Sequence, residues 1–436
     1  MRTARNLAGK IAKARAVWWK RVVAMSIKVR NRLIALFCLG VFVAGGAFFY
    51  NNWVVQKPFG LILFVGDGLT TGQLAAARIY KGGGEAPLNL ERLPNLALLR
   101  TCANDFAVPD AAAAASAIST GVKVNNRSIA INAAGEPLES LVDVARKSGR
   151  ATGLVSNVAV TDATSAAFYA HSDNPLDHEG LAKSLQEGAK FDVVLGGGEA
   201  DFLPDTKGGR RTDGADLILE LRRQGFDVIR SQTELDNTPA WRAPRVFGLF
   251  SEGNLQFAAS SNRPESQPSL ATMVQRAIEL LQFNQRGYLL VVDAGLIAKA
   301  SHNNEGEGML REILELDAAI GAAIEYAGEN TLIVACGKQS VGGFRLNGYP
   351  FKNDRGVSIL GKNAQGIPFI TWSTGPGGVD GANPDAPSVI EPAAFAASAG
   401  IGVAEDTIAA GRGPGAESLR GFDDNTSVFR VFKRQM

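Results

Sequence analysis

From Phe59 onward, apolar runs alternate along the chain with segments of helical spacing. Five unalternating apolar runs predict buried strands at Leu61–Val65, Leu154–Asn157, Asp192–Leu195, Tyr288–Val292 and Thr331–Ala335. Helical spacing predicts helices that begin near Thr70, Asp110, Ala163, Ser269 and Gly308. Buried strands separated by helices are typical of parallel sheets, so we expect an α/β fold with a large, mostly parallel central sheet and helices on both faces. The Gly- and Pro-rich segment Pro376–Pro392 predicts an irregular insertion.

The first 57 residues follow a different pattern. Residues 33–50 read LIALFCLGVFVAGGAFFY and carry no charge. At about 1.5 Å per residue they would span about 27 Å, close to the thickness of a hydrocarbon core. They predict an uncleaved single-pass transmembrane anchor, joined by a linker over residues 51–57 to one domain over residues 58–436. The small residues at positions 44–47 leave a cleaved signal peptide as the alternative.

The net charge of +2 conceals an asymmetry. Residues 1–32 contain ten basic and no acidic residues, which leaves 35 basic against 43 acidic residues in the remainder. A basic segment before an apolar run stays in the cytoplasm, so we expect a bacterial inner-membrane protein with a cytoplasmic N-terminus and a periplasmic domain. Apolar residues at every third or fourth position of residues 1–32 predict an amphipathic segment on anionic lipid, with a disordered basic tail as the alternative. Because the anchor explains this charge, we expect no nucleic-acid partner.

Polar residues follow several of the predicted strands. They are Asp67, Asp162, Thr164, Asp293, Lys338 and Gln339. In parallel sheets, ligands bind beyond the carboxyl ends of the strands, so we expect these side chains to converge there. A single Asp at a strand end is more often a helix cap or a turn residue. Several polar residues together favour a binding or catalytic site.

Several segments, in order along the chain, resemble the alkaline phosphatase family. They include LILFVGDG, VPDAAAAASAISTGVK, TDATSAAFYAH, DVVLGGGEADFLP, LLVVDAGLIAKASHNN and GPGAESLRGFDDNTSVFR, and the resemblance covers roughly residues 58–436. It implies two-metal hydrolysis of phosphomonoesters. In that chemistry a serine at a helix N-terminus attacks phosphorus, two zinc ions assist, an arginine clamps the phosphate and a magnesium site lies alongside.

The position that the resemblance assigns to the nucleophile is Ala111, which has no oxygen with which to attack. Ser116 lies more than one helical turn further on, so we expect it to pack within the helix rather than to replace the nucleophile. The clamping arginine is expected at the position of Pro175. The sequence therefore predicts no intact set of catalytic residues.

The zinc ligands that the resemblance implies are mostly replaced. The matching positions are Ala298, His302 and Gly402 for one zinc, and Asp67, Lys338 and Gln339 for the other. His302 is thus an orphan ligand, and no histidine follows it in the chain. Because zinc normally takes three or four protein ligands, we do not expect zinc to bind.

The magnesium ligands that the resemblance implies are better kept. Asp67 and Thr164 match, and Asp293 stands where the family has Glu, so these three residues are a candidate site for one Mg²⁺. Asp162 is a candidate to support these ligands. We also expect the Lys338 ammonium to form an ion pair with Asp67, because a partly buried carboxylate needs a compensating cation.

The sequence leaves three functions open. The first is a pseudoenzyme used in binding or scaffolding, and the second is a residual magnesium-dependent hydrolase. The third is an anion-binding module at the N-terminus of the helix that starts at Asp110. The expected partners are membrane lipids contacting residues 1–50 and an unidentified protein or small anion. The family resemblance also suggests a homodimer.

Overall fold

A computed structural model of the chain describes residues 27–49, 59–242, 244–347, 360–378 and 390–436. The chain divides into two compact units, residues 1–57 and residues 58–436. In the first unit, helix α2 covers Ile27–Phe49. Among the described residues, no helix is both long enough and apolar enough to cross a membrane, so the anchor predicted over residues 33–50 is not confirmed. The predicted linker, residues 1–26 and most of the predicted insertion lie outside the described residues.

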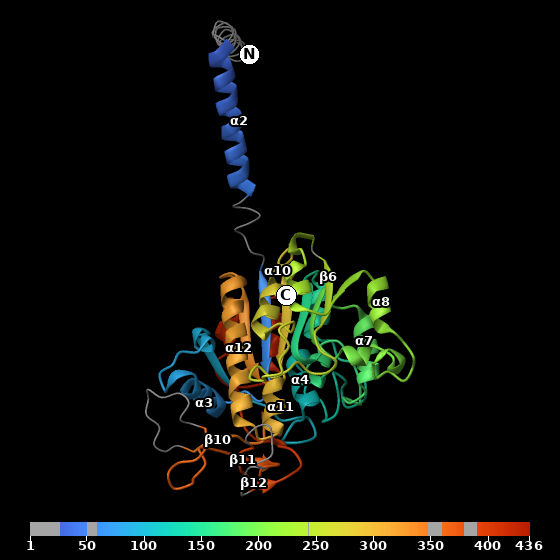
Figure 1. The fold of residues 1–436 in the computed structure, drawn as a ribbon, viewed down its shortest axis with the longest axis vertical. Helices are drawn as coiled ribbons and strands as arrows, with labels where there is room; N and C mark the ends of the chain where they lie inside the picture. The colour runs from blue at the N-terminus through green and yellow to red at the C-terminus, as the bar shows by residue number, and fades with distance from the viewer. Residues whose placement is uncertain (1–26, 50–58, 243, 348–359, 379–389) are drawn as a thin grey trace, which may run out of the picture. The chain divides into compact units, whose positions relative to one another are not determined.

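The second unit is built on a ten-stranded sheet (Figure 1). Its strands are β1 (Gly60–Gly66), β2 (Asn95–Arg100), β3 (Ala151–Ala159), β4 (Val193–Gly197), β5 (Phe226–Ile229), β6 (Arg245–Leu249), β7 (Tyr288–Ala294), β8 (Leu332–Gly337), β14 (Thr407–Arg412) and β15 (Gly421–Asp424). They lie in the order β15-β2-β14-β8-β1-β7-β3-β4-β6-β5. Only β14 runs antiparallel to its neighbours among the strands of this sheet. The predicted large, mostly parallel sheet is therefore confirmed.

Two small sheets lie outside the main sheet. One joins β10 (Arg345–Leu346), β11 (Ile370–Gly375) and β12 (Ala393–Ala396), and the other pairs β9 (Ser340–Val341) with β13 (Gly402–Val403). Because β9 directly follows the end of β8, the pairing with β13 brings a distant segment to the carboxyl end of the main sheet.

Helices cover both faces of the main sheet (Figure 1). They are α3 (Thr71–Gly82), α4 (Ala111–Thr120), α5 (Leu141–Lys147), α6 (Ala163–Ala166), α7 (His178–Gly188), α8 (Leu217–Arg223), α9 (Gln232–Asn237), α10 (Leu270–Leu281), α11 (Leu296–His302), α12 (Gly306–Tyr326) and α13 (Ser427–Lys433). One buried cluster joins a face of the sheet to α3, α10 and α12. A second cluster joins the opposite face to α4, α5, α7, α8 and α13.

Strand β1 shows why the central strands are apolar throughout. Ile62 and Phe64 point into the first cluster, whereas Leu61, Leu63 and Val65 point into the second. Successive side chains of a strand face opposite sides, so a strand covered on both faces needs apolar residues at every position. The continuous apolar run seen in the sequence is the direct result.

Side-chain caps set four of the five predicted helix starts, whereas α12 begins at Gly306 without one. Thr70, Asp110 and Ser269 each accept a backbone N–H from the first turn of α3, α4 and α10, respectively. Such caps satisfy backbone donors that have no partner within the helix. Asp162 caps α6 in the same way, although this helix is only four residues long.

Candidate functional site

The polar residues predicted to converge do lie together at the carboxyl ends of four neighbouring strands. Asp67 follows β1, Asp293 lies in β7 opposite Val65, and Lys338 follows β8, whose Gly337 pairs with Gly66 of β1. Thr164 reaches the same place from α6, just after β3. The strand order β8-β1-β7-β3 thus positions the whole group.

The Lys338 ammonium lies at the centre of this group. Its Nζ donates to Asp67 Oδ2 at 2.9 Å and to Thr164 Oγ1 at 2.6 Å. The side chain is fully buried, and Asp67 is only 5% exposed. The expected Asp67–Lys338 ion pair is confirmed, whereas the second contact, to Thr164, was not predicted from the sequence. A lysine ammonium therefore contacts two of the three candidate magnesium ligands.

Asp293 is the third candidate magnesium ligand and is completely buried. Its Oδ2 accepts hydrogen bonds from Ser165 Oγ at 2.8 Å and from Ser156 Oγ at 3.4 Å. Burial, together with the negative charges of Asp162 and Asp67, raises the pKa of Asp293 to about 7. The Oδ1 atoms of Asp293 and Asp67 are buried without a hydrogen-bond partner. Lys338 thus bonds to one oxygen of Asp67 and leaves the other Asp67 oxygen and Asp293 Oδ1 without a partner.

Asp162 forms a second ion pair beside the first. Lys299 Nζ, from α11, donates to Asp162 Oδ2 at 2.8 Å. Burial opposes ionisation of Asp162, but the ammonium groups of Lys299 and Lys338 hold its pKa below the usual value. Attraction to Asp162 in turn raises the pKa of Lys299. Asp162 thus lies beside the candidate ligands and accepts the Thr164 backbone N–H at 3.3 Å, and its charge partner is a lysine that sequence reasoning missed. The available signal was the position of Lys299, next to Ala298 in the segment compared with the zinc ligands.

The positions matched to the zinc ligands lie near one another but lack metal-binding groups. Ala298 and His302 are one turn apart on α11, and the His302 Nδ1 atom is 2.6 Å from the backbone oxygen of Gly400. Gly402, in β13, pairs with Val341, two residues after Gln339. Within the described part of the chain, no group of three or more His, Cys, Asp or Glu residues could hold a metal ion. The donor set does not fit zinc.

The donor set also fits magnesium poorly while Lys338 is in place. Its ammonium uses the Asp67 and Thr164 oxygens that a cation would need. A divalent ion at the same point would meet a fixed positive charge in a buried environment, where Coulomb repulsion is strong. As arranged, these residues bind an internal ammonium.

Helix α4 begins at Ala111, the residue at the nucleophile position. The Asp110 carboxylate caps this helix, accepting Ala113 N–H at Oδ1 (2.8 Å) and Arg127 N–H at Oδ2 (2.6 Å). A carboxylate thus already occupies donors that could face an anion. Ser116 is fully buried and bonds to backbone groups of Ser128 and Ala130, so the prediction that it packs within the fold is confirmed.

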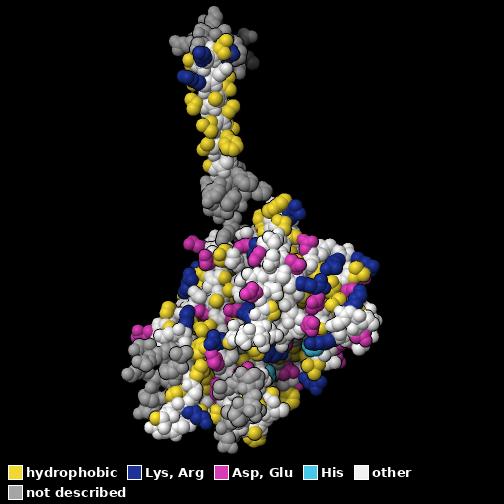
Figure 2. All heavy atoms as spheres, viewed as in Figure 1, with side chains coloured by type: hydrophobic (Ala, Val, Ile, Leu, Met, Phe, Trp, Pro, Cys, Tyr) yellow, Lys and Arg dark blue, Asp and Glu magenta, His cyan; other side chains and the backbone are white. Residues whose placement is uncertain are grey.

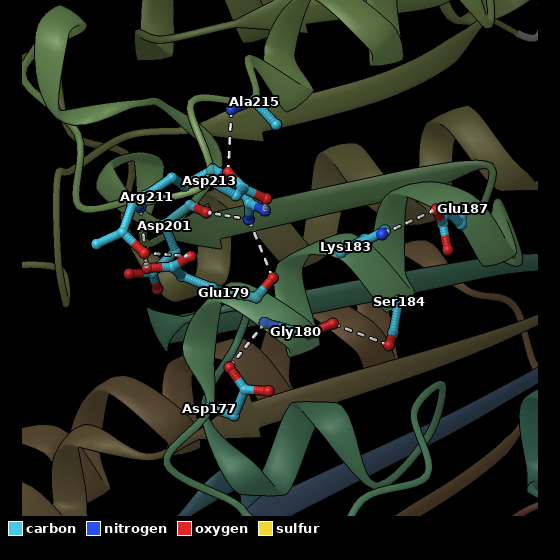
Figure 3. Close-up of polar contacts among 11 residues, drawn as sticks. Asp177, Glu179, Gly180, Lys183, Ser184, Glu187, Asp201, Arg211, Asp213 and Ala215 are labelled. Atoms are coloured by element: carbon cyan, nitrogen blue, oxygen red, sulfur yellow. Dashed lines mark hydrogen bonds and ion pairs between the residues drawn. The ribbon is translucent and has the colours of Figure 1, made fainter.

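The buried arginine Arg211 has a structural role. Arg211 is 1% exposed and donates to the backbone oxygens of Glu179 and Asp201 and to the Asp213 carboxylate (Figure 3). Asp201 also accepts the Thr161 hydroxyl at 2.5 Å, which fixes the residue before Asp162. The Arg211 guanidinium is fully engaged by these groups, so it cannot serve as a phosphate clamp.

Comparisons with known proteins agree on one family. The profile described as alkaline phosphatase matches residues 60–436. Alkaline phosphatase 4 of Bacillus subtilis (strain 168) is 30% identical over 313 residues, which cover 69% of this chain and 65% of the relative. The chain thus spans slightly less than two thirds of that relative.

Solved structures share the fold. The alkaline phosphatase of Thermus thermophilus is 26% identical, with a TM-score of 0.69 over 86% of this chain and 90% of its own. A variant of the alkaline phosphatase from the Antarctic bacterium TAB5, solved with Mg bound in its M3 site, is 22% identical. It has a TM-score of 0.68 over 87% of this chain and 98% of its own.

Proposed function

The chain belongs to the alkaline phosphatase family, and from that premise we propose that residues 58–436 are a pseudoenzyme used in binding or scaffolding, without phosphomonoesterase activity. The observation that carries the proposal is the buried Lys338 ammonium, bonded to both Asp67 and Thr164. An ammonium neutralises a carboxylate but cannot act as a Lewis acid or deliver hydroxide. The ammonium therefore supplies the positive charge that the buried carboxylate needs, but not the catalytic functions of a metal ion.

The nucleophile position supports the same proposal. Ala111 starts α4 with no hydroxyl, and the Asp110 carboxylate lies at the helix N-terminus where a phosphate would need free donors. Like charges at one helix end repel each other, so phosphate binding there should be weak. The residues needed for phosphomonoesterase activity are therefore replaced at the nucleophile, at the metal ligands and at the anion site.

The proposal also includes the cellular location and membrane orientation of the protein. We propose that residues 1–50 hold it at the bacterial inner membrane, with the N-terminus in the cytoplasm and residues 58–436 in the periplasm. The support is the ten basic residues that precede the uncharged run over residues 33–50. Protease added to intact spheroplasts should digest the domain; full protection of the domain until lysis would contradict this orientation. Family membership also suggests a homodimer. The ligand that we propose is an unidentified protein or small anion.

The decisive experiment measures metal content and turnover on one sample. The full-length chain, purified in detergent, is dialysed against zinc and magnesium; bound metal and hydrolysis of p-nitrophenyl phosphate are then measured beside an Asp67→Ala control. We expect no stoichiometric zinc and no turnover above the control. An Ala111→Ser variant should also stay inactive, because restoring the hydroxyl does not restore the metal ligands. Two bound zinc ions with turnover that requires Asp67 would overturn the proposal.

A residual magnesium-dependent hydrolase is the second candidate function. The observation that favours it is the pair of buried, unpartnered oxygens, Asp67 Oδ1 and Asp293 Oδ1. If Mg²⁺ displaced the Lys338 ammonium, Asp67, Thr164 and Asp293 would hold the ion, and it would supply an activated water. Magnesium-dependent turnover lost in Asp67→Ala would favour this function; turnover unchanged in that variant would indicate a contaminating enzyme.

A further inference from the structure

The main sheet ends at β5, a strand with one open side. Its inner side pairs with β6, and no other strand of the described residues pairs with its outer side. Alternate residues of a strand direct their backbone N–H and C=O groups to opposite sides. Arg230 N–H, just after β5, donates to Glu234 Oε2 rather than to β6. The backbone groups of Val228, two residues earlier, therefore face outward, and so do those of Phe226.

A groove of about 580 Å³ runs along this outer side of β5. All four residues of β5 line it, between a wall at Arg222 of α8 and a wall formed by Glu234, Asn237, Thr238 and Pro239. Figure 1 shows α8 at this flank of the domain, beyond β6. Because the strand lies between two walls, a flexible extended chain can reach its backbone, whereas the equally recessed β5 of a second copy cannot. Four residues of a strand span about 13 Å, so a short peptide is long enough to pair with it.

The amino end of the groove carries positive charge. The Arg222 side chain is exposed there, and its guanidinium has no ion pair or hydrogen bond within the described part of the chain. Its neighbour Arg223, by contrast, is paired with Glu220. Arg245 Nη1 donates to the Gln224 backbone oxygen at 3.4 Å and adds a second charge at this end. Figure 2 shows Lys and Arg side chains on the flank of the domain where α8 lies in Figure 1.

Carboxylates lie further along the groove. Asp227 is exposed on β5, and Glu234 lies at the carboxyl end of the strand. Val228, next to Asp227, is only half-buried, so a neighbouring apolar side chain could cover it. Cross-strand neighbours stabilise a sheet when apolar residues or opposite charges face each other. The groove therefore favours an occupant with a carboxylate at the amino end of β5, an apolar residue beside Val228 and a basic residue beside Asp227.

We propose that β5 binds the carboxyl-terminal segment of a partner protein as an additional, antiparallel strand. In this direction the peptide ends at the amino end of β5, where its carboxylate pairs with the Arg222 guanidinium. The last residue and the third from the end are apolar and lie beside Phe226 and Val228, while a basic residue between them faces Asp227. Backbone hydrogen bonds supply affinity, and the side chains supply specificity. The inference rests on the binding role proposed above and names the kind of partner.

The test titrates the full-length chain, in detergent, into a fluorescent seven-residue peptide that ends in Val-Lys-Val with a free carboxylate. Anisotropy should show saturable binding. Amidation of the peptide terminus should weaken binding about tenfold, as should Arg222→Gln, because each change removes one charge-assisted hydrogen bond. Arg223→Gln is the matched control, since the adjacent Arg223 is paired with Glu220 and does not line the groove. We expect this control to bind as the wild type does.

Val228→Pro tests the backbone pairing. Proline removes the outward N–H of this edge strand, whereas the hydrogen bonds to β6 belong to Asp227 and Ile229 and are kept. Val228→Ala keeps the N–H and is the control for the shortened side chain. We expect the proline variant to bind more weakly than the alanine variant. The amidated peptide tests the same proposal without any change to the protein.

Four results would overturn the proposal. They are absence of saturable binding, equal affinity for the amidated peptide, binding unchanged by Arg222→Gln, and binding weakened equally by Arg223→Gln, which would indicate unspecific attraction. Dimers seen by light scattering and lost in Val228→Pro would also overturn it, because they would assign the edge to a second copy. None of these results bears on the absence of phosphomonoesterase activity, which is tested by metal content and turnover at the carboxyl ends of β1 and β8.

Discussion

At the scale of single residues, Lys338 places a buried positive charge at a position that the family resemblance assigns to a zinc ligand. Its four-carbon chain delivers one positive charge between Asp67 and Thr164 without any bound ion. A buried ion pair adds little stability by itself, but removing one partner leaves a buried charge without compensation. The residue therefore acts as a permanent internal counter-ion.

Lys338→Ala should be strongly destabilising for this reason. We expect the free energy of unfolding to fall by about 3–5 kcal/mol, measured by urea denaturation, with Mg²⁺ restoring part of the loss. Lys299→Ala should cost less, because the side chain of Lys299 is 39% exposed and water screens the charge left behind. The double variant Lys338→Ala, Asp67→Asn should recover stability relative to Lys338→Ala. If Lys338→Ala alone is neutral, the ammonium does not serve as a counter-ion.

Sequence reasoning predicted much of this site at residue level and missed specific pairings. Strand ends and the family resemblance together indicate which polar residues lie close to one another. They pointed to Asp67, Thr164, Asp293 and Lys338. The Thr164 contact of Lys338 depends on a side-chain rotamer, which no sequence pattern determines. The Asp162–Lys299 pair joins α6 to α11 across the site, and only the packed fold defines that contact.

At the scale of elements, α12 is attached to its surroundings by buried carboxylates. Glu391 accepts the Gly306 N–H at 2.6 Å and the Trp372 indole N–H at 3.0 Å, linking the helix start to β11. Glu312, in the helix, accepts the Ala258 N–H at 2.7 Å. Burial raises the pKa of each of these two glutamates to about 7. Ionisation of either carboxylate would place a buried negative charge at these contacts, which costs stability.

The stability should therefore fall as pH rises from about 4.5 to about 7. In this window the folded state keeps the Glu391 proton that the unfolded state has lost, so ionisation favours unfolding; above pH 7 the effect levels off. Glu391→Gln should reduce the fall by about 1–3 kcal/mol. Urea denaturation at pH 5 and pH 7.5 measures it. Glu307→Gln, at an exposed position of the same helix, should leave the pH dependence unchanged.

The end of α4 depends on a glycine. Gly121 has φ of +72°, and a Cβ there would lie 2.6 Å from a ring carbon of Phe429 in α13. Gly121→Ala should therefore combine backbone strain with a steric clash and lower the free energy of unfolding by about 2–4 kcal/mol. Gly135→Ala is the matched control, since Gly135 has φ of +80° and no atom within 4 Å of such a Cβ. We expect the control to lose only about 1–2 kcal/mol. Equal losses in denaturant titrations would show that Phe429 does not limit this position.

Element prediction succeeded for five of the buried strands but missed β6 and β14, which are buried as well. β1, β4, β7 and β8 each contain a continuous apolar run, and the predicted strands match them with small errors at the ends. β3 reads ATGLVSNVA, and its predicted range, Leu154–Asn157, covers only its middle. β14 reads TIAAGR, whose small residues give no strand signal, and β15 reads GFDD at the sheet edge. These two strands exist because β2 and β8 offer them hydrogen-bonding edges, a requirement that is set by the assembled sheet.

At the scale of the whole molecule, the two compact units should be thermodynamically separate. Both large buried clusters of the described residues lie between Phe59 and Met436. We therefore expect residues 58–436 alone to unfold within about 2 °C of the full-length chain, because ordering of the domain core sets the melting temperature. Calorimetry of both chains in the same detergent checks this. A large drop in the shorter chain would mean that residues 1–57 stabilise the domain.

The strand order of the main sheet also determines when β2 can find its partners during synthesis. In that sheet β2 pairs only with β14 and β15, which follow it by about 300 residues. At 5–20 residues per second, a ribosome needs roughly 15–60 s to supply those partners. Until then β2, with Leu96, Leu98 and Leu99, stays an open edge that invites aggregation. We therefore expect an incomplete chain that stops before β14 to leave β2 unpaired and open to aggregation.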